Sequence, residues 1–234
     1  MTKAASKEAR WVDVPGERFP GWVASFAVRH AAGAAGEPAA ALATERGPHT
    51  VTFTGPDGAV AECHPPFPES LRWPGGADGP GELAAVCAAH AQVPRTVGVL
   101  LARLGGYAAG VFSGYPPALA ESKVGSRLVH GRSAAGGWSQ HRFARRREKQ
   151  ASEAMNAAAA AAAAVFGRGP RLDAVVLGGD KRAVAELRDE PRLAPYLALA
   201  TERFITVPDP KRSVLDGAPR LYLAVRIKLT EPRG

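Results

Sequence analysis

A short loop rich in glycine and alanine precedes a single glutamine in this chain. The residues from Gly131 to Gln140 read GRSAAGGWSQ. Gly136 and Gly137 allow the backbone to adopt positive φ angles and to approach another surface closely. A glutamine amide can orient a water molecule, and backbone N–H groups near a helix start stabilise developing negative charge. Because water attack on an ester carbonyl needs both features, Gln140 is the candidate catalytic residue.

The segment that carries this loop holds nearly all of the chain's excess positive charge. The whole chain has a formal net charge of +8. Residues 123–150 contain eight basic residues against the single acidic Glu148, a net charge of +7. The basic residues are Lys123, Arg127, Arg132, Arg142, Arg145, Arg146, Arg147 and Lys149. Such a segment attracts phosphate groups, which favours RNA as the partner, although a solvated charged face is the commoner explanation of a charge run.

Four of the basic residues follow helical spacing. Arg142, Arg145, Arg146 and Lys149 stand at i, i+3, i+4 and i+7, so they share one helix face and are the main candidates for RNA backbone contacts. The full set of predicted RNA contacts comprises Lys123, Arg127, Arg132, Trp138, Arg142, Arg145, Arg146 and Lys149.

Two residues between the glycines and the glutamine have open roles. Trp138 is suited to stack on a nucleobase, a contact worth about 1–3 kcal/mol, or to pack the base of the loop. Ser139 is suited to cap the following helix or to hold Gln140. We include Gly136, Gly137 and Ser139 with Gln140 in the predicted catalytic site.

Length and composition limit the class of protein. The 234 residues, 46% of them hydrophobic, suffice for one good core or two small domains. Two cysteines are too few for a disulfide scaffold. No apolar run approaches the length of a membrane span, and the first residues lack a signal-peptide core. We therefore expect a cytoplasmic protein with reduced thiols that associates with neither membranes nor DNA and is monomeric.

The pattern of residues 1–95 predicts a small accessory module of helices and strands. The first ten residues are polar, and residues 31–48 and 65–81 are rich in residues that break regular structure. The predicted elements are a helix over 19–30, a β-hairpin over 51–63 and a short helix over 82–92.

Residues 96–234 predict a mixed sheet covered by helices, within an α/β fold class. Three strands come first, over 97–104, 107–112 and 120–130, with Gly105-Gly106 as the tight turn between the first two. A long helix over 140–166 follows, favoured by an unbroken alanine run. The remaining predicted elements are a strand over 172–177, helices over 181–188 and 191–200, and strands over 204–207 and 220–229.

Metal and nucleotide sites have little support in the sequence. The Cys63-His64 and Cys87–His90 segments lack the paired-cysteine spacing of a zinc site. Asp173 and Asp180 flank a predicted buried strand, but a two-metal nuclease needs several converging carboxylates. The Gly178–Lys181 stretch lacks the spacing of a phosphate-binding P-loop. We expect neither a metal ion nor a cofactor.

An extended signature resembles a known family. The stretch from Gly131 through Gly136-Gly137-Trp138-Ser139-Gln140 to Arg142-Phe143-Ala144-Arg145-Arg146-Arg147-Glu148 is similar to the signature of the Vms-type release-factor-like (VLRF) domain, in its actinobacterial peptidyl-tRNA hydrolase branch. Gly105-Gly106-Tyr107 and the residues 122–127 also resemble that branch, and the resemblance covers about residues 96–230. The family is itself similar to the catalytic middle domain of archaeal and eukaryotic class-one release factors.

This resemblance implies both a fold and an activity. It implies a ribonuclease-H-like topology, and entry of Gly136, Gly137, Ser139 and Gln140 into the peptidyl-transferase centre with Gln140 as the key residue. The implied partners are the large ribosomal subunit and peptidyl-tRNA, and the implied role is the release of nascent chains in ribosome rescue. Release factors have Gly-Gly-Gln contiguous, whereas Trp138 and Ser139 intervene here, so we expect Gln140 on the first turn of the helix.

The expectation is a metal-independent peptidyl-tRNA hydrolase. One alternative is an endonuclease that cleaves the tRNA acceptor end with the same loop. The other is a ribosome-binding or RNA-binding factor without catalytic activity.

Overall fold

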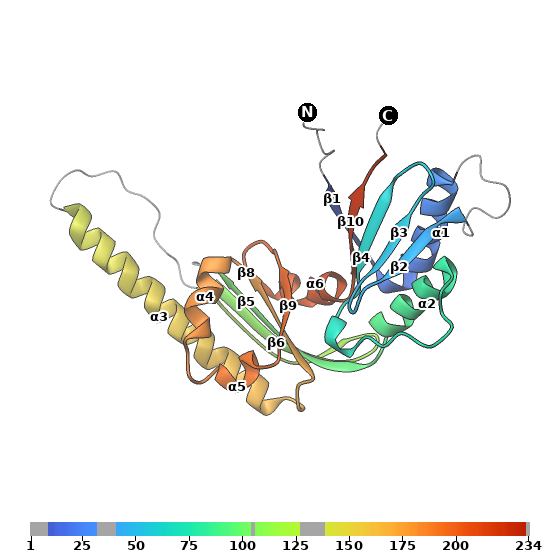
Figure 1. Ribbon diagram of the computed structural model, residues 1–234. Coiled ribbons are helices and arrows are strands. Elements are labelled where there is room, and N and C mark those ends of the chain that lie inside the picture. The colour runs from blue at the N-terminus through green and yellow to red at the C-terminus, as the bar shows by residue number, and fades with distance from the viewer. Residues whose placement is uncertain (1–8, 32–40, 104–105, 127–138, 233–234) are drawn as a thin grey trace. The chain divides into compact units, whose positions relative to one another are not determined.

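The computed structural model describes the backbone of residues 9–31, 41–103, 106–126 and 139–232, and their side chains apart from residue 126 and residues 139–151. The chain divides into two compact units (Figure 1). The first unit comprises Met1–Val93 together with Leu223–Gly234, and the second comprises Pro94–Tyr222. No helix in the described ranges is both long and apolar enough to cross a membrane.

The first unit is an antiparallel sheet with two helices on one face. Its strands lie in the order β1-β10-β4-β3-β2. Alternate strand residues such as Phe53, Cys63 and Ile227 are buried against Phe26 and Leu83 of the helices. The elements are β1 (Arg10–Val14), α1 (Phe19–His30), β2 (Ala43–Arg46), β3 (Val51–Thr54), β4 (Val60–His64), α2 (Pro80–Ala91) and β10 (Val225–Thr230).

The hairpin between β3 and β4 matches its prediction. Gly58 has a φ of +88°, which glycine adopts without strain. The Asp57 carboxylate accepts a hydrogen bond from the backbone N–H of Ala59 at 3.0 Å. This local bond fixes the turn that the Gly-Pro-Asp-Gly sequence predicts.

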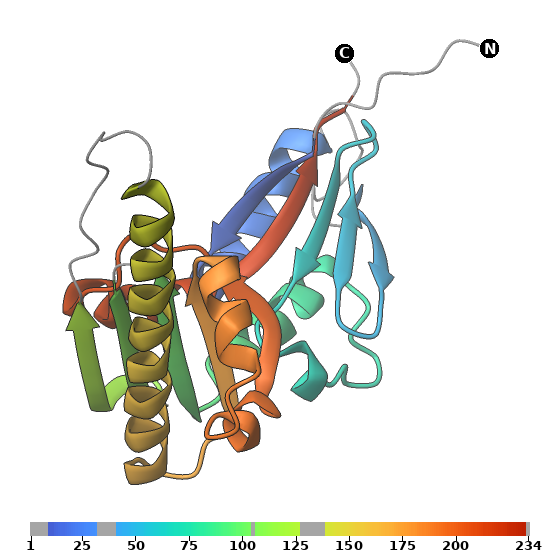
Figure 2. The same cartoon turned by 90° about the vertical axis from the view of Figure 1, so that its left-hand side faces the viewer.

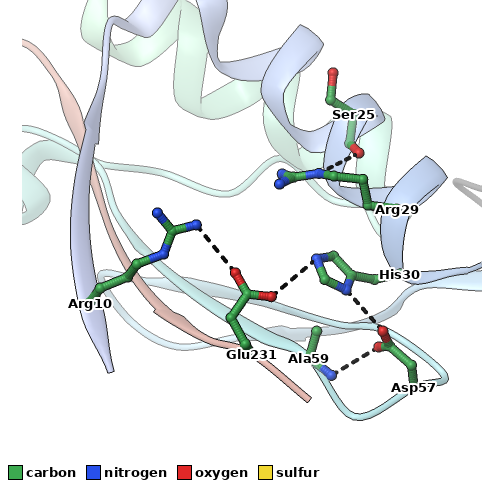
Figure 3. A network of polar contacts seen from close by, with 7 residues as sticks. All are labelled: Arg10, Ser25, Arg29, His30, Asp57, Ala59 and Glu231. Atoms are coloured by element: carbon green, nitrogen blue, oxygen red, sulfur yellow. Dashed lines mark hydrogen bonds and ion pairs between the residues drawn. The ribbon is translucent and has the colours of Figure 1, made fainter. Parts of the chain in front are cut away.

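A polar network joins four parts of the first unit that are distant in sequence (Figure 3). The buried His30 ring at the end of α1 lies 2.9 Å from Asp57 through Nδ1 and 3.8 Å from Glu231 through Nε2. Glu231 also pairs with Arg10 on β1 at 3.2 Å. The pKa of Asp57 is lowered, chiefly by the Ala59 N–H and then by His30. The network ties the residues after β10 to α1 and the hairpin.

The second unit has the ribonuclease-H-like topology that the resemblance implies. Its sheet has the order β7-β6-β5-β8-β9. The first three strands form an antiparallel meander, and β8 and β9 run parallel to β5. The elements are β5 (Arg95–Arg103), β6 (Gly106–Gly114), β7 (Ala118–Ser126), α3 (Ser139–Arg168), β8 (Ala174–Gly179), α4 (Lys181–Arg188), α5 (Ala194–Leu197), β9 (Ala200–Ile205) and α6 (Arg212–Tyr222).

Helices cover both faces of this second sheet. Buried alanines of α3 pack with α4 over one face, in a cluster that includes Leu100, Val111 and Leu177. Leu215 of α6 contacts the opposite face, close to Gly110. Small residues bring α3 near the sheet, because a Cβ on Gly98 would lie 3.1 Å from the Phe166 ring.

Two expectations about the C-terminal part of the chain are wrong. Residues 212–222 form α6, whereas the sequence predicted a strand from residue 220, because Gly217 and Pro219 obscure the helical spacing of the buried Leu215, Ala218 and Tyr222. The strand that follows, β10, pairs with β1 and β4 of the first unit. The predicted catalytic domain of residues 96–234 therefore loses Leu223–Gly234 to the other unit.

Other differences are smaller. The strand β2 occupies residues predicted as a loop, and β1 occupies residues 10–14, where the sequence predicted no strand, since both are edge strands with few buried residues. The strand β7 begins at Ala118 rather than at residue 120, α5 has four residues rather than ten, and β9 begins at Ala200 rather than at residue 204. Residues 127–130 of the predicted third strand lie outside the described residues.

Candidate functional site: the start of the long helix

The predicted catalytic loop connects β7 to α3. The strand ends at Ser126 and the helix begins at Ser139. Five of the predicted site residues lie in the intervening segment, outside the described residues: Arg127, Arg132, Gly136, Gly137 and Trp138. Ser139 and Gln140 are the first two residues of the helix. The expectation that Gln140 belongs to the first helical turn is therefore confirmed.

The start of α3 lies far along the helix from the buried side chains that the structure describes on it. Its 30 residues correspond to about 45 Å at 1.5 Å per residue. Among the described side chains of α3, the buried ones begin with Ala154. Gln140 precedes Ala154 by about 21 Å along the helix axis. Figures 1 and 2 both show the N-terminal end of α3 extending past the end of β7.

The four basic residues occupy positions on one face of α3, which we call the basic line. Positions 142, 145, 146 and 149 continue, at spacings of three and four, into Glu153, Asn156, Ala160 and Ala164. All four of these later residues are exposed. The side chains of Arg142, Arg145, Arg146 and Lys149 are themselves outside the described set. Their positions nevertheless belong to the line that faces solvent farther along the helix.

The position of Gln140 belongs to a different line. Positions 140, 144, 147 and 151 continue at the same spacings into Ala154, Ala158, Ala162 and Val165, which are buried. At 100° per residue this line lies nearly opposite the line of basic positions. The position of Gln140 and the positions of the four basic residues therefore lie on opposite faces of the helix.

Lys123 is the predicted RNA contact whose side chain the structure describes. It is exposed on the edge strand β7 and pairs in register with Ala109. Because Ala109 belongs to the cluster beneath α3, Lys123 lies on the sheet face that carries this helix.

Tyr107 and Gly125 form the last cross-strand pair but one before β7 ends. They are register partners in β6 and β7. The Tyr107 ring lies so close over Gly125 that a Cβ there would stand 2.5 Å from its Cζ. The glycine allows the aromatic ring to cover β7 just before the segment that leads to Gln140.

One contact near the site could not be read from the sequence. Arg212, the first residue of α6, donates a hydrogen bond to the Ser122 hydroxyl on β7 at 3.4 Å. The two residues are 90 positions apart, and no local pattern links them.

The family is decided by the match of residues 95–228 to the model of the Actinobacteria/chloroflexi VLRF1 release factor. The chain belongs to this family. The VLRF1 release factor match covers the whole sheet of the second unit, the segment that leads to Gln140 and all of α3.

Weaker likenesses link the VLRF1 release factor chain to solved structures. A Vms1 mitochondrial localization core is 11% identical, with a TM-score of 0.36 over 79% of this chain and 77% of that one. The archaeal translation termination factor aRF1 is 13% identical, with a TM-score of 0.40 over 93% and 68%. Pelota from Archaeoglobus fulgidus is 9% identical, with a TM-score of 0.28 over 95% and 64%. No curated protein matches the chain in sequence.

Asp173 and Asp180 of this VLRF1 release factor lie too far apart to bind the same pair of metal ions. Asp173 and Asp180 stand at opposite ends of β8, about 23 Å apart along an extended strand. Asp180 caps α4 by accepting hydrogen bonds from the backbone N–H groups of Arg182 and Ala183 at 2.9 and 3.0 Å. Asp173 accepts one from the Thr96 N–H at 2.7 Å. Both carboxylates therefore bind backbone N–H groups, Asp180 within its own helix start and Asp173 on the neighbouring strand β5.

The two cysteines belong to the core of the first unit. Both are free and buried. Burial raises the pKa of Cys87 to about 12, and burial raises that of Cys63 as well. The Nε2 atom of His90 donates to the carbonyl oxygens of Pro66 and Phe67, so it is engaged by the backbone rather than by a metal site shared with the two cysteines. Within the described ranges no three metal-ligating residues are grouped so that they could hold an ion.

Proposed function

We propose that this protein is a peptidyl-tRNA hydrolase of release-factor type. It frees nascent chains from tRNA on stalled large ribosomal subunits, acting in the cytoplasm as a monomer without a metal ion or cofactor. The observation that carries the proposal is the start of α3 at Ser139, which makes Gln140 a first-turn residue about 21 Å along the helix axis from Ala154, the first buried residue among the described side chains of α3. A long, narrow projection with an uncharged amide at its end suits entry into a site enclosed by RNA.

The proposed chemistry is ester hydrolysis. The Gln140 amide orients a water molecule toward the carbonyl carbon that joins the peptide to the 3′ oxygen of the tRNA. The first N–H groups of α3 have no partner within the helix, so they are available to stabilise the oxyanion. The water oxygen bonds to the carbonyl carbon and the bond to the tRNA oxygen breaks. The products are a peptide carboxylate and a tRNA with an intact 3′ hydroxyl.

Gln140 has no titratable group, so it positions the water rather than accepting its proton. The proton passes to groups of the RNA or of the substrate, and the leaving tRNA oxygen gains one. The rate should therefore show no pKa that belongs to Gln140.

The basic line of α3 supports the RNA partner. Arg142, Arg145, Arg146 and Lys149 occupy positions nearly opposite that of Gln140, so they can bind the phosphates of one RNA wall while the glutamine faces another. Lys123 adds an exposed cation on the face of the second sheet that α3 covers.

A release assay with purified stalled large-subunit complexes tests the proposal. Gln140→Ala should reduce the rate of peptide release by about 100-fold or more, while binding to the subunit is retained. Gln150→Ala is the matched control, because it removes an amide from the same helix about 15 Å from the catalytic position. Mapping the 3′ end of the product tRNA identifies the broken bond.

Each alternative gives a distinct result. A product tRNA with a shortened 3′ end would show that the protein cleaves the acceptor end rather than the ester bond. If release is no faster with the wild-type protein than without it, the protein is a ribosome-binding factor without catalytic activity. Undiminished release by Gln140→Ala would remove Gln140 from the mechanism.

A further inference from the structure

Five basic residues gather at the end of the second sheet from which the catalytic segment departs. The strands β5, β7, β8 and β9 all run in one direction, so their C-terminal ends lie along the same side of the sheet, perpendicular to the strands. We call the cluster at this edge the basic edge. It consists of Arg103 at the end of β5, Lys181 and Arg182 at the start of α4, and Lys211 and Arg212 where α6 begins.

Printed contacts hold the parts of the basic edge together. Arg103 donates a hydrogen bond to the Val207 carbonyl at 3.0 Å, so the connection from β9 to α6 passes the end of β5. Arg212 reaches β7 through Ser122. Since β7 and β8 are three strand spacings apart, the basic edge extends over about 14 Å. Several phosphates of one RNA helix fit along that length.

Three of these cations are exposed and have no ion-pair partner among the described residues. Lys181, Arg182 and Lys211 are exposed, and none of them makes an ion pair within the part of the chain that the structure describes. The nearby Asp180 carboxylate is already engaged by two backbone N–H groups of α4. The other two cations have partners, because Arg212 lies 2.8 Å from Asp216 and Arg103 lies 3.7 Å from Asp209.

The placement of these cations works against helix stability. Both α4 and α6 lack an acidic residue in the first turn and begin with basic residues instead. Positive charge at a helix N-terminus opposes the helix dipole and is unfavourable. Sequence choices that conflict with local stability concentrate at functional sites, because binding compensates for them.

We propose that the basic edge binds the phosphate backbone of RNA, as a second anchor distinct from the basic line of α3. The choice of RNA rests on the proposed function. Four strands end here, including β7, which leads toward Gln140. This anchor therefore binds RNA that flanks the catalytic segment. The sequence did not reveal it, since its members come from three separate stretches of near-neutral chain.

Charge reversal in the full-length protein tests this anchor. Lys181→Glu with Arg182→Glu should weaken RNA binding at least about 10-fold and reduce the slope of log affinity against log salt by about 1.4 to 1.8. The control is Arg188→Glu with Arg220→Glu, which changes the net charge equally at the C-terminal ends of the same two helices. The control should stay within about twofold of the wild type. Lys211→Glu should weaken binding independently.

Misfolding cannot imitate the expected result. Acidic residues at the start of α4 complement the helix dipole, so the double variant should melt at the same temperature as the wild type or higher. Loss of binding with retained thermal stability supports the anchor. Affinity and salt slope equal to those of the control would overturn it.

Two RNA partners are tested in parallel, free tRNA and large subunits without tRNA. A loss confined to tRNA assigns the anchor to the substrate, and a loss with empty subunits assigns it to ribosomal RNA. Peptide release is measured separately, so the two proposals fail separately. If wild-type release is absent but the double variant binds RNA poorly, only the hydrolase proposal falls. If release is normal and RNA binding is unchanged, only the anchor falls.

Discussion

The Tyr107 ring lies across Gly125, its cross-strand partner, at a distance that leaves no room for a Cβ on residue 125 unless the ring moves. Because Gly125 is the last residue but one of β7, this pair covers the strand immediately before the segment that leads to Gln140. The contact gives a physical reason for a glycine in an edge strand, where β-branched residues pack better.

Gly125→Ala should displace the Tyr107 ring and reduce the free energy of unfolding by about 1 kcal/mol, the size of an aromatic cross-strand contact. Urea denaturation measures the change. In the Tyr107→Ala background the same substitution should cost almost nothing, because the ring is already gone. Equal costs in both backgrounds would show that the ring is not the cause.

Gly179 should be intolerant of any side chain. Its φ of +103° is strained for other residues, and a Cβ would collide with the Ala102 carbonyl of the neighbouring strand. Gly179→Ala should therefore lose about 2 kcal/mol or more. Gly217 in α6 is the contrasting case, with open space around it. Gly217→Ala should gain up to about 1 kcal/mol, and thermal melting of both variants gives the comparison.

Asp180 should act through its side-chain oxygen rather than its charge. Asp180→Ala removes the cap of α4 and should reduce the free energy of unfolding by about 1 kcal/mol, whereas Asp180→Asn should be nearly neutral. Equilibrium unfolding distinguishes the two variants. An equally large loss with asparagine would point to a role for the carboxylate charge.

The two thiols should be unreactive in the folded protein. A raised pKa means that less thiolate is present at a given pH, and thiolate is the reactive form. At about pH 8, a thiol reagent should label Cys63 and Cys87 only after denaturant is added. Fast labelling of the native protein would contradict their burial in the first unit.

The basic line of α3 should contribute to RNA affinity. Arg145→Glu with Arg146→Glu should weaken binding to large subunits and reduce the slope against salt by about 1.4 to 1.8. Arg171→Glu is a suitable control, since Arg171 is exposed just beyond the other end of the helix. An unchanged salt slope would assign the charged line to solvent alone.

Local patterns predicted the second unit well because its signals are strong. The apolar run before Gly178 and the alanine run of α3 each specify one element with little help from distant residues. Gly105 of the predicted tight turn lies outside the described residues, and Gly106 is the first residue of β6. The helix start next to Gln140 followed from the same reasoning. The sequence therefore predicted the succession of β5 to β9 along the chain, but not which of these strands are neighbours in the sheet.

Long-range pairing was beyond the sequence. The alternation of Val225, Ile227 and Leu229 correctly indicates a strand, yet it contains no information on which sheet receives that strand. The basic edge escaped notice for the same reason, because Arg103, Arg182 and Arg212 come together only through the parallel ends of β5, β8 and β9. Sequence periodicity describes faces of elements rather than neighbours across a sheet.

The position of β10 has a consequence for synthesis of the chain. This strand lies between β1 and β4, so the first unit lacks an inner strand until residue 230 has been made. The first unit, although it begins the chain, must therefore complete its folding after the release-factor unit that interrupts it. Until β10 has been synthesised, the edges of β1 and β4 that it joins lack their hydrogen-bonding partner.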